Sequence, residues 1–231
     1  TQQMRYAGSL IAGVFFTSEI VRGRRNFGAK LIPNRGAWLE FETSSRDVIS
    51  VKIDRKRRIP VTTLLRSLGF SGTEEIQKLF SDLDTNPDHK YIETTLDKDP
   101  AQNQTEGYVE VYKRIRPGDL ATPENARAFL EAIFYSPKRY DLGHVGRYKL
   151  NKRLGLDVPN TPPNRILIAQ DIVDIVREII RLNNTKHALP DDIDSLHNRR
   201  IRAVGELVQS RVRVGMLRLE RIIRDRMSVT D

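Results

Sequence analysis

The chain has 231 residues, of which 39% are apolar and 30% charged, so it can bury a real core beside a hydrated surface. It contains no cysteine, which excludes disulfides and thiolate metal ligands. The net charge of +9 favours a polyanionic partner such as nucleic acid, without showing which one. No run approaches the roughly 18 apolar residues of a membrane helix, so no membrane contact is expected. Because the first residue is Thr1 rather than Met, we expect a piece of a longer chain.

The first sixty residues are expected to form a small antiparallel sheet. Four segments are rich in β-branched and aromatic residues or alternate between apolar and polar side chains: 8–17, 29–32, 37–42 and 48–53. The breakers PNRG and TSSRD separate the last three of them. Trp38 is the only tryptophan. Composition favours a core anchor for it, and the alternative is a platform on which an unpaired base stacks.

After residue 60 the apolar pattern changes to the helical period. Helices are expected within 55–70 and at 71–83, 88–96, 106–115, 122–134, 142–154 and 168–182. Ser71 and Thr122 are the expected N-caps of two of them, with Pro123 in the first turn after Thr122. Residues 197–227 hold the helical period for about eight turns, with an Arg-rich opposite face, and predict one long helix.

The predicted fold class is therefore α+β. A small antiparallel N-terminal sheet packs with a mainly helical C-terminal part that ends in one long helix. We divide the chain into residues 1–190, which are strand-rich over 1–60 and helical over 61–190, and residues 191–231 with the long helix.

The segment DDIDSLHNRRIR at 191–202 is the strongest candidate site. Its aspartates could bind Mg²⁺, but arginines follow and no further acidic partner is nearby, so helix capping is favoured. NRRIR at 198–202 is expected to open the long helix, where backbone amides and Arg side chains can meet phosphate or a guanine edge. The basic run at 55–58 is a weaker signal, equally typical of a solvated strand end. No nucleotide-binding loop or catalytic motif is present, so no catalytic residue and no metal site are predicted.

Long segments of unusual composition resemble, in the same order, the β subunit of bacterial DNA-directed RNA polymerase. They are GVFF (13–16), LIPNRGAWLEFE (31–42), VKIDRKRRIPVTTLLRSLGF (51–70), RIRPGD (114–119), SPKRYDLGHVGRYKLNKRL (136–154) and the region 191–228. The matching region is the lobe, or β2 domain, with the helix that leads back to the protrusion. The family usually has Arg-Ser-Pro-Gly where this chain has Leu10-Ile11-Ala12-Gly13. Many relatives also carry a large insertion that this chain lacks.

The resemblance implies roles for single residues. In the family the lobe forms one side of the downstream DNA cleft and helps to hold the opened non-template strand. Asp194 matches the carboxylate of a pocket that accepts a flipped-out guanine, with Ile193 and Arg199 as its walls. Trp38 matches an indole that stacks on a neighbouring base. Arg200 and Arg202 complete the expected DNA-binding set, as backbone-facing or structural residues.

The resemblance also implies partners. These are the non-template strand and downstream duplex, the β′ and α subunits, a σ factor and transcription regulators. The expected location is the bacterial cytoplasm near the nucleoid. The parent would be a nucleotidyltransferase whose Mg²⁺ another subunit holds, so the piece itself would carry neither catalytic residues nor a cofactor. The alternative is a protein-interaction module whose basic face binds regulators or the acidic part of σ. A free-standing enzyme is disfavoured.

Overall fold

The computed structural model describes residues 8–228, which fall into two units. The larger unit is Ile11–Asp191. The smaller unit contains residues 8–10 and 192–228 of the described chain.

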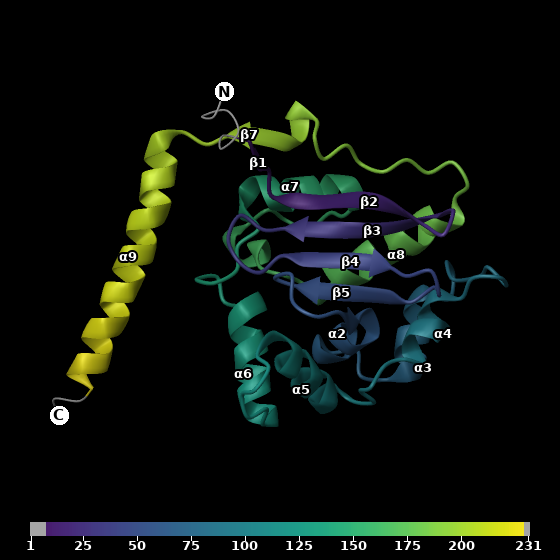
Figure 1. Ribbon diagram of the computed structural model, residues 1–231, viewed down its shortest axis with the longest axis horizontal. Helices are drawn as coiled ribbons and strands as arrows, with labels where there is room; N and C mark the ends of the chain where they lie inside the picture. Colours follow the sequence, from purple (N-terminus) through teal and green to yellow (C-terminus); the bar gives the residue numbers. More distant parts are fainter. Residues whose placement is uncertain (1–7, 229–231) are drawn as a thin grey trace. The chain divides into compact units, whose positions relative to one another are not determined.

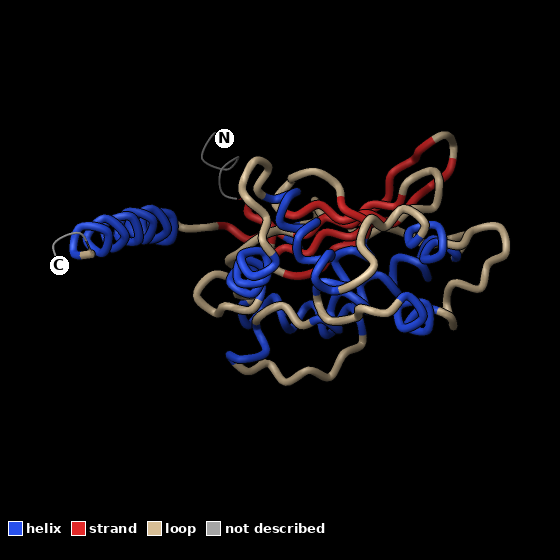
Figure 2. Tube along the Cα trace, turned by 90° about the horizontal axis from the view of Figure 1, so that it is seen from below, coloured by secondary structure: helices blue, strands red, loops and turns tan. Residues whose placement is uncertain are grey.

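A five-stranded antiparallel meander forms the centre of the larger unit, in the order β2-β3-β4-β5-β6 (Figure 1). Its strands are β2 (Gly13–Val21), β3 (Arg24–Ile32), β4 (Leu39–Thr43), β5 (Ile49–Ile53) and β6 (Ile59–Pro60). Alternate residues of β4 and β5 are buried, as the sequence pattern predicts for a sheet covered on one face. Figure 2 shows most helices of this unit on one side of the strands.

The long β2–β3 hairpin was not predicted as a unit. The register runs unbroken from Gly13 opposite Ile32 to Val21 opposite Arg24. At its tip, Arg22 and Gly23 have φ of 52° and 79°, the left-handed pair of a type I′ turn that matches the twist of paired strands. The expected strand at 8–17 is instead split between β1 and β2. The extension of β2 to Val21 was not predicted, because its residues toward the hairpin tip include polar ones.

Seven α-helices of the larger unit follow the predicted order. They are α2 (Val61–Ser67), α3 (Thr73–Phe80), α4 (Tyr91–Leu96), α5 (Gln104–Ile115), α6 (Pro123–Phe134), α7 (Gly143–Leu154) and α8 (Ala169–Asn184), and a 3₁₀ turn η1 (Pro162–Arg165) lies within the proline-rich loop. The Thr122 cap is confirmed, since its hydroxyl accepts from Asn125 N at 3.3 Å. The Ser71 cap is wrong. Gly72 holds that position and has no side chain to cap with.

The core lies between the sheet and these helices. The apolar face of α8, with Ile172, Val176 and Ile179, is fully buried there. The β3–β4 ladder covers only residues 29–31 of β3, and before it the side chain of Asn183 on α8 bonds to both strands. It accepts from Phe27 N at 2.9 Å, and its amide donates to the Thr43 hydroxyl at 3.3 Å. The α8 helix is thereby bonded to the sheet as well as packed on it.

The smaller unit corrects the prediction for the start of the long helix. β7 (Arg199–Ile201) pairs antiparallel with β1 (Gly8–Leu10), after a 3₁₀ turn η2 (Leu196–Asn198), and the helix α9 runs only over Val204–Met227. Asp192 explains the change. Its carboxylate accepts from the backbone N–H of Asp194 and Ser195, and its carbonyl accepts from the Asn198 amide, which favours a turn over a helix. The fold class, a sheet followed by helices with a long last helix, is confirmed.

Candidate nucleic-acid interface

Trp38 lies at the entry to β4 and is half-buried rather than part of the core. Both the backbone N–H and the backbone carbonyl of Trp38 form hydrogen bonds with Asp54. Trp38 N donates to the Asp54 carboxylate at 2.8 Å, and Asp54 N donates to the Trp38 carbonyl at 2.9 Å. Its neighbours Ala37 and Leu39 are buried in the core. The core-anchor interpretation is therefore wrong, because Trp38 is only half-buried and lies outside the buried core.

A basic turn lies against this indole. The guanidinium carbon of Arg55 is 5.5 Å from the centroid of the Trp38 ring. Asp54 and Arg55 have φ of 48° and 59°, and Lys56 N donates to the Ile53 carbonyl at 3.0 Å, which closes a tight left-handed turn. Such a conformation costs about 1–3 kcal/mol per non-glycine residue and persists only where neighbours hold it. Here the Asp54–Trp38 hydrogen bonds hold it.

The predicted guanine pocket residues lie in the smaller unit. The Asp194 side chain is 88% exposed, and its carboxylate is 3.4 Å from the Arg199 guanidinium, which is 40% exposed. Ile193 is half-buried beside it in the chain. Leu10 of β1 lies directly opposite Arg199 of β7. Leu10 stands where the family usually has an arginine, so that position is next to Arg199. The structure brings the Asp194 and Arg199 side chains together.

Arg200 and Arg202 both contact the carboxylate of Glu206, and not that of Asp194. Arg200 forms a two-pronged pair with Glu206, one contact being 3.1 Å, and Arg202 Nε lies 3.4 Å from the same side chain. Hydrogen bonding from Arg200, with the charge of both arginines, lowers the pKa of the Glu206 carboxyl. Two cations on one anion leave a local excess of positive charge. This geometry is compatible with a structural role that also presents charge to a phosphate.

The aspartates of the candidate segment are not a cluster. Asp191 belongs to the larger unit, where it accepts from Phe16 N at 2.8 Å and from Arg153 at 3.3 Å. Asp192 is committed to the turn described above. Among residues 8–228 there is no group of three His, Cys, Asp or Glu that could hold a metal ion. In the same part of the chain, no helix combines the length and apolar character needed to cross a membrane.

Arg55 is the site residue that sequence reasoning missed. The run RKRR was noted, but its contact with Trp38 depends on strand register. Leu39 pairs with Ile53, so the residues just outside that pair, Trp38 and Asp54, are adjacent and Arg55 follows. An expected β4–β5 hairpin with this register could have revealed the contact.

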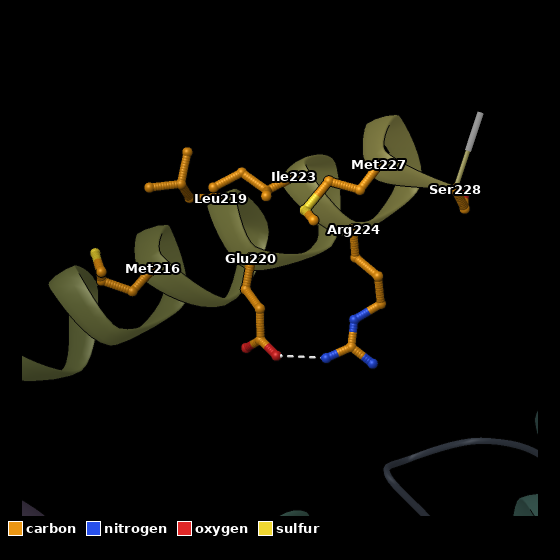
Figure 3. Close-up of a pocket in the computed structure, with 7 residues that line it drawn as sticks. All are labelled: Met216, Leu219, Glu220, Ile223, Arg224, Met227 and Ser228. Carbon is orange, nitrogen blue, oxygen red and sulfur yellow. Dashed lines mark hydrogen bonds and ion pairs between the residues drawn. The ribbon is translucent and has the colours of Figure 1, made fainter. Parts of the chain in front are cut away.

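The α9 helix carries an apolar stripe and a polar side. Figure 3 shows Met216, Leu219, Ile223 and Met227 along one side, with the 2.9 Å pair of Glu220 and Arg224 on another. The four apolar side chains are 48–67% exposed. The helical period predicted for this segment is confirmed, but in this unit the period does not correspond to a buried face.

Comparison with known proteins places these features in a family. Residues 14–202 match the family model described as RNA polymerase Rpb2, domain 2. The chain therefore belongs to that family. It corresponds to the lobe region of a bacterial RNA polymerase β subunit, as the motifs predicted.

Similar proteins carry the description DNA-directed RNA polymerase subunit beta. The chain is 49% identical to the protein from Chloroflexus aggregans, 50% to that from Dehalococcoides mccartyi and 46% to that from Gloeobacter violaceus. Each match covers 95% of this chain but only 20%, 17% and 19% of the relative. The chain thus spans about a fifth of the length of the curated relatives that it matches.

Proposed function

We propose that this lobe forms one wall of the downstream DNA cleft of a bacterial RNA polymerase and contacts the non-template strand during initiation and elongation. One observation carries the proposal. The Asp194 carboxylate is highly exposed, and the Arg199 guanidinium lies 3.4 Å from it. A solvent-facing carboxylate beside a guanidinium can accept from the N–H groups of a base while the arginine neutralises a phosphate or binds a base acceptor.

Guanine is the base that this pair fits best. The Watson–Crick edge of a flipped-out guanine presents two adjacent N–H donors, which one carboxylate can accept together. Cytosine offers a single amine there. Ile193 supplies an apolar wall for the flipped base. Trp38, in the other unit, is proposed to stack on a neighbouring base of the same strand.

The test compares single-stranded DNA that carries one guanine with the same strand carrying cytosine. The 231-residue chain should bind the guanine strand more tightly, and Asp194→Ala should remove that preference, a change of about 1–3 kcal/mol for a two-bond contact. General affinity should persist, because arginines supply it. Binding would be measured by the anisotropy of a labelled strand.

Glu220→Ala is the matched control, since it removes an exposed carboxylate from the same unit. It should keep the guanine preference. Equal binding of the two strands by the unsubstituted chain would contradict the pocket assignment.

The wider roles rest on the resemblance to the β subunit and are part of the proposal. The parent would be a nucleotidyltransferase in the bacterial cytoplasm near the nucleoid, with its Mg²⁺ held by another subunit. It would assemble with β′, α and σ, and regulators could reach the lobe. In this scheme the lobe handles DNA and performs no chemical step.

A second candidate is a protein-interaction module, and the exposed stripe of α9 favours it. Contiguous apolar surface on a soluble helix marks a protein contact, and the other side of α9 is rich in arginine. The stripe would pack against the remainder of a β subunit, because the matched relatives are about five times as long as this chain. The basic side would meet acidic regulators or the acidic part of σ. Failure of the chain to bind either strand would favour this candidate.

A further inference from the structure

We propose that Arg55 is a movable cover on the Trp38 indole. A single-stranded base displaces it, and the released guanidinium then binds the adjoining phosphate. This inference rests on the proposed function, because both require single-stranded DNA to reach the larger unit. It adds Arg55, and its displacement by the incoming base, to the Trp38 stacking that the proposed function already contains.

The indole is built as a rigid platform. Two hydrogen bonds with Asp54, one accepted and one donated by it, fix the Trp38 backbone, and buried Ala37 and Leu39 flank it in the sequence. The side chain itself is half-buried, so part of the ring remains accessible. A fixed aromatic surface loses little entropy when a base stacks on it, and every base has a face to offer.

Arg55 is held loosely over that platform. Its side chain is 76% exposed, and the nearest carboxylate, that of Glu40, is 4.0 Å away. An exposed cation–π contact favours the closed position only about 2- to 5-fold. Stacking of a base on an aromatic side chain favours the bound state about 5- to 150-fold. The base therefore outcompetes the guanidinium.

The turn determines where the displaced arginine goes. Its left-handed conformation keeps Arg55 next to Trp38 even when the guanidinium has left the ring. Lys56 and Arg57 follow in the same turn with exposed side chains, and within residues 8–228 neither takes part in an ion pair, whereas Arg58 binds Glu42 at 2.9 Å. The base on Trp38 would thus have cations beside its own phosphates. This combination of an aromatic face and a basic track is typical of single-strand binding.

Trp38 is the only tryptophan, so the intrinsic fluorescence of the chain reports on this site alone. The probe is oligothymidylate, which carries no guanine and therefore does not depend on the Asp194 pocket. Its binding to the 231-residue chain would be followed by the anisotropy of a label on the DNA. Tryptophan emission would be recorded in the same titration. Saturable quenching along the anisotropy isotherm is expected.

In Arg55→Gln the slope of log affinity against log salt should fall by about 0.7, the value for one phosphate contact to a single strand. The affinity at about 0.1 M salt should fall by less than about 5-fold, because removal of the cover favours stacking about 2- to 5-fold and offsets part of the lost phosphate contact. Arg46→Gln is the matched control, because Arg46 is exposed in the turn at the other end of β4. It should leave the quenching amplitude unchanged. Both substituted side chains are exposed, so both variants should fold.

The outcomes separate the two proposals. Binding seen by anisotropy without a change in Trp38 emission would overturn this inference and leave the DNA contact of the lobe intact. Quenching and a salt slope that are unaffected by Arg55→Gln would overturn the role of Arg55. If neither oligothymidylate nor the guanine strand binds, the proposed function fails, and the inference fails with it.

Discussion

Arg147 on α7 and Asp171 on α8 form an ion pair that solvent does not reach, with the two side chains 0% and 1% exposed. Two hydrogen bonds of 2.7 and 3.0 Å join them. Arg147 also donates to the Ile166 carbonyl, and Asp171 accepts from Ile168 N. The two charges of the pair thus neutralise each other, and the pair also bonds two backbone groups just before α8. Removal of one partner leaves the other charged in the core.

Arg147→Met should therefore lower the free energy of unfolding by about 3–5 kcal/mol. Urea denaturation followed by Trp38 fluorescence measures this, since Trp38 lies in the same unit. Arg127→Met, which removes an exposed pair on α6, should leave the unfolding midpoint unchanged. A loss for Arg147→Met no larger than that of the control would contradict this account of the pair.

At the scale of elements, α7 and α8 are also joined at the edge of the core. Glu178 of α8 accepts from Arg181 of its own helix at 2.6 Å and from Arg153 of α7 at 2.9 Å. Burial alone would raise the pKa of Glu178, but the hydrogen bonds from Arg181 and Arg153 outweigh it and bring that pKa below its ordinary value of 4.5. Because the folded protein favours the charged form, this stabilisation is present above pH 4.5 and is lost as the pH falls further.

Glu178→Gln should accordingly reduce stability by about 1–3 kcal/mol at neutral pH. Below pH 4.5 the difference between the variant and the unsubstituted chain should shrink. Urea midpoints on both sides of that pH check this. Glu19→Gln, at an exposed position of β2 that forms no ion pair within residues 8–228, should change neither value. A constant difference across the pH range would show that the ion pairs are not its source.

The elements that the sequence predicted well are those with a strong local signal. The α6 helix has its cap and proline at the start, and α8 has an apolar face of regular period, so both begin within one residue of the expected position. The helix predicted for residues 198–202 was wrong because two effects compete with helix formation there. Pairing of β7 with β1 and the Asp192 turn are both invisible to a periodicity argument.

At the scale of the molecule, the net charge of +9 predicted a polyanionic partner, and the family assignment is consistent with it. The candidate site was only partly predictable. Asp194 and Trp38 were found through the family motifs, and their exposure could be learned only from the structure. Arg55 was missed because its partner is seventeen positions away and is reached only when β4 and β5 are in register.

The central claim is that this lobe contacts the non-template strand. Photo-crosslinking tests it most directly, in an assembled polymerase that carries this lobe on an open promoter. A thio-substituted guanine would be placed in the non-template strand. The account predicts crosslinks that map to residues 192–202, with a loss on Asp194→Ala and retention on Glu220→Ala. Crosslinks that map only outside this chain would contradict it.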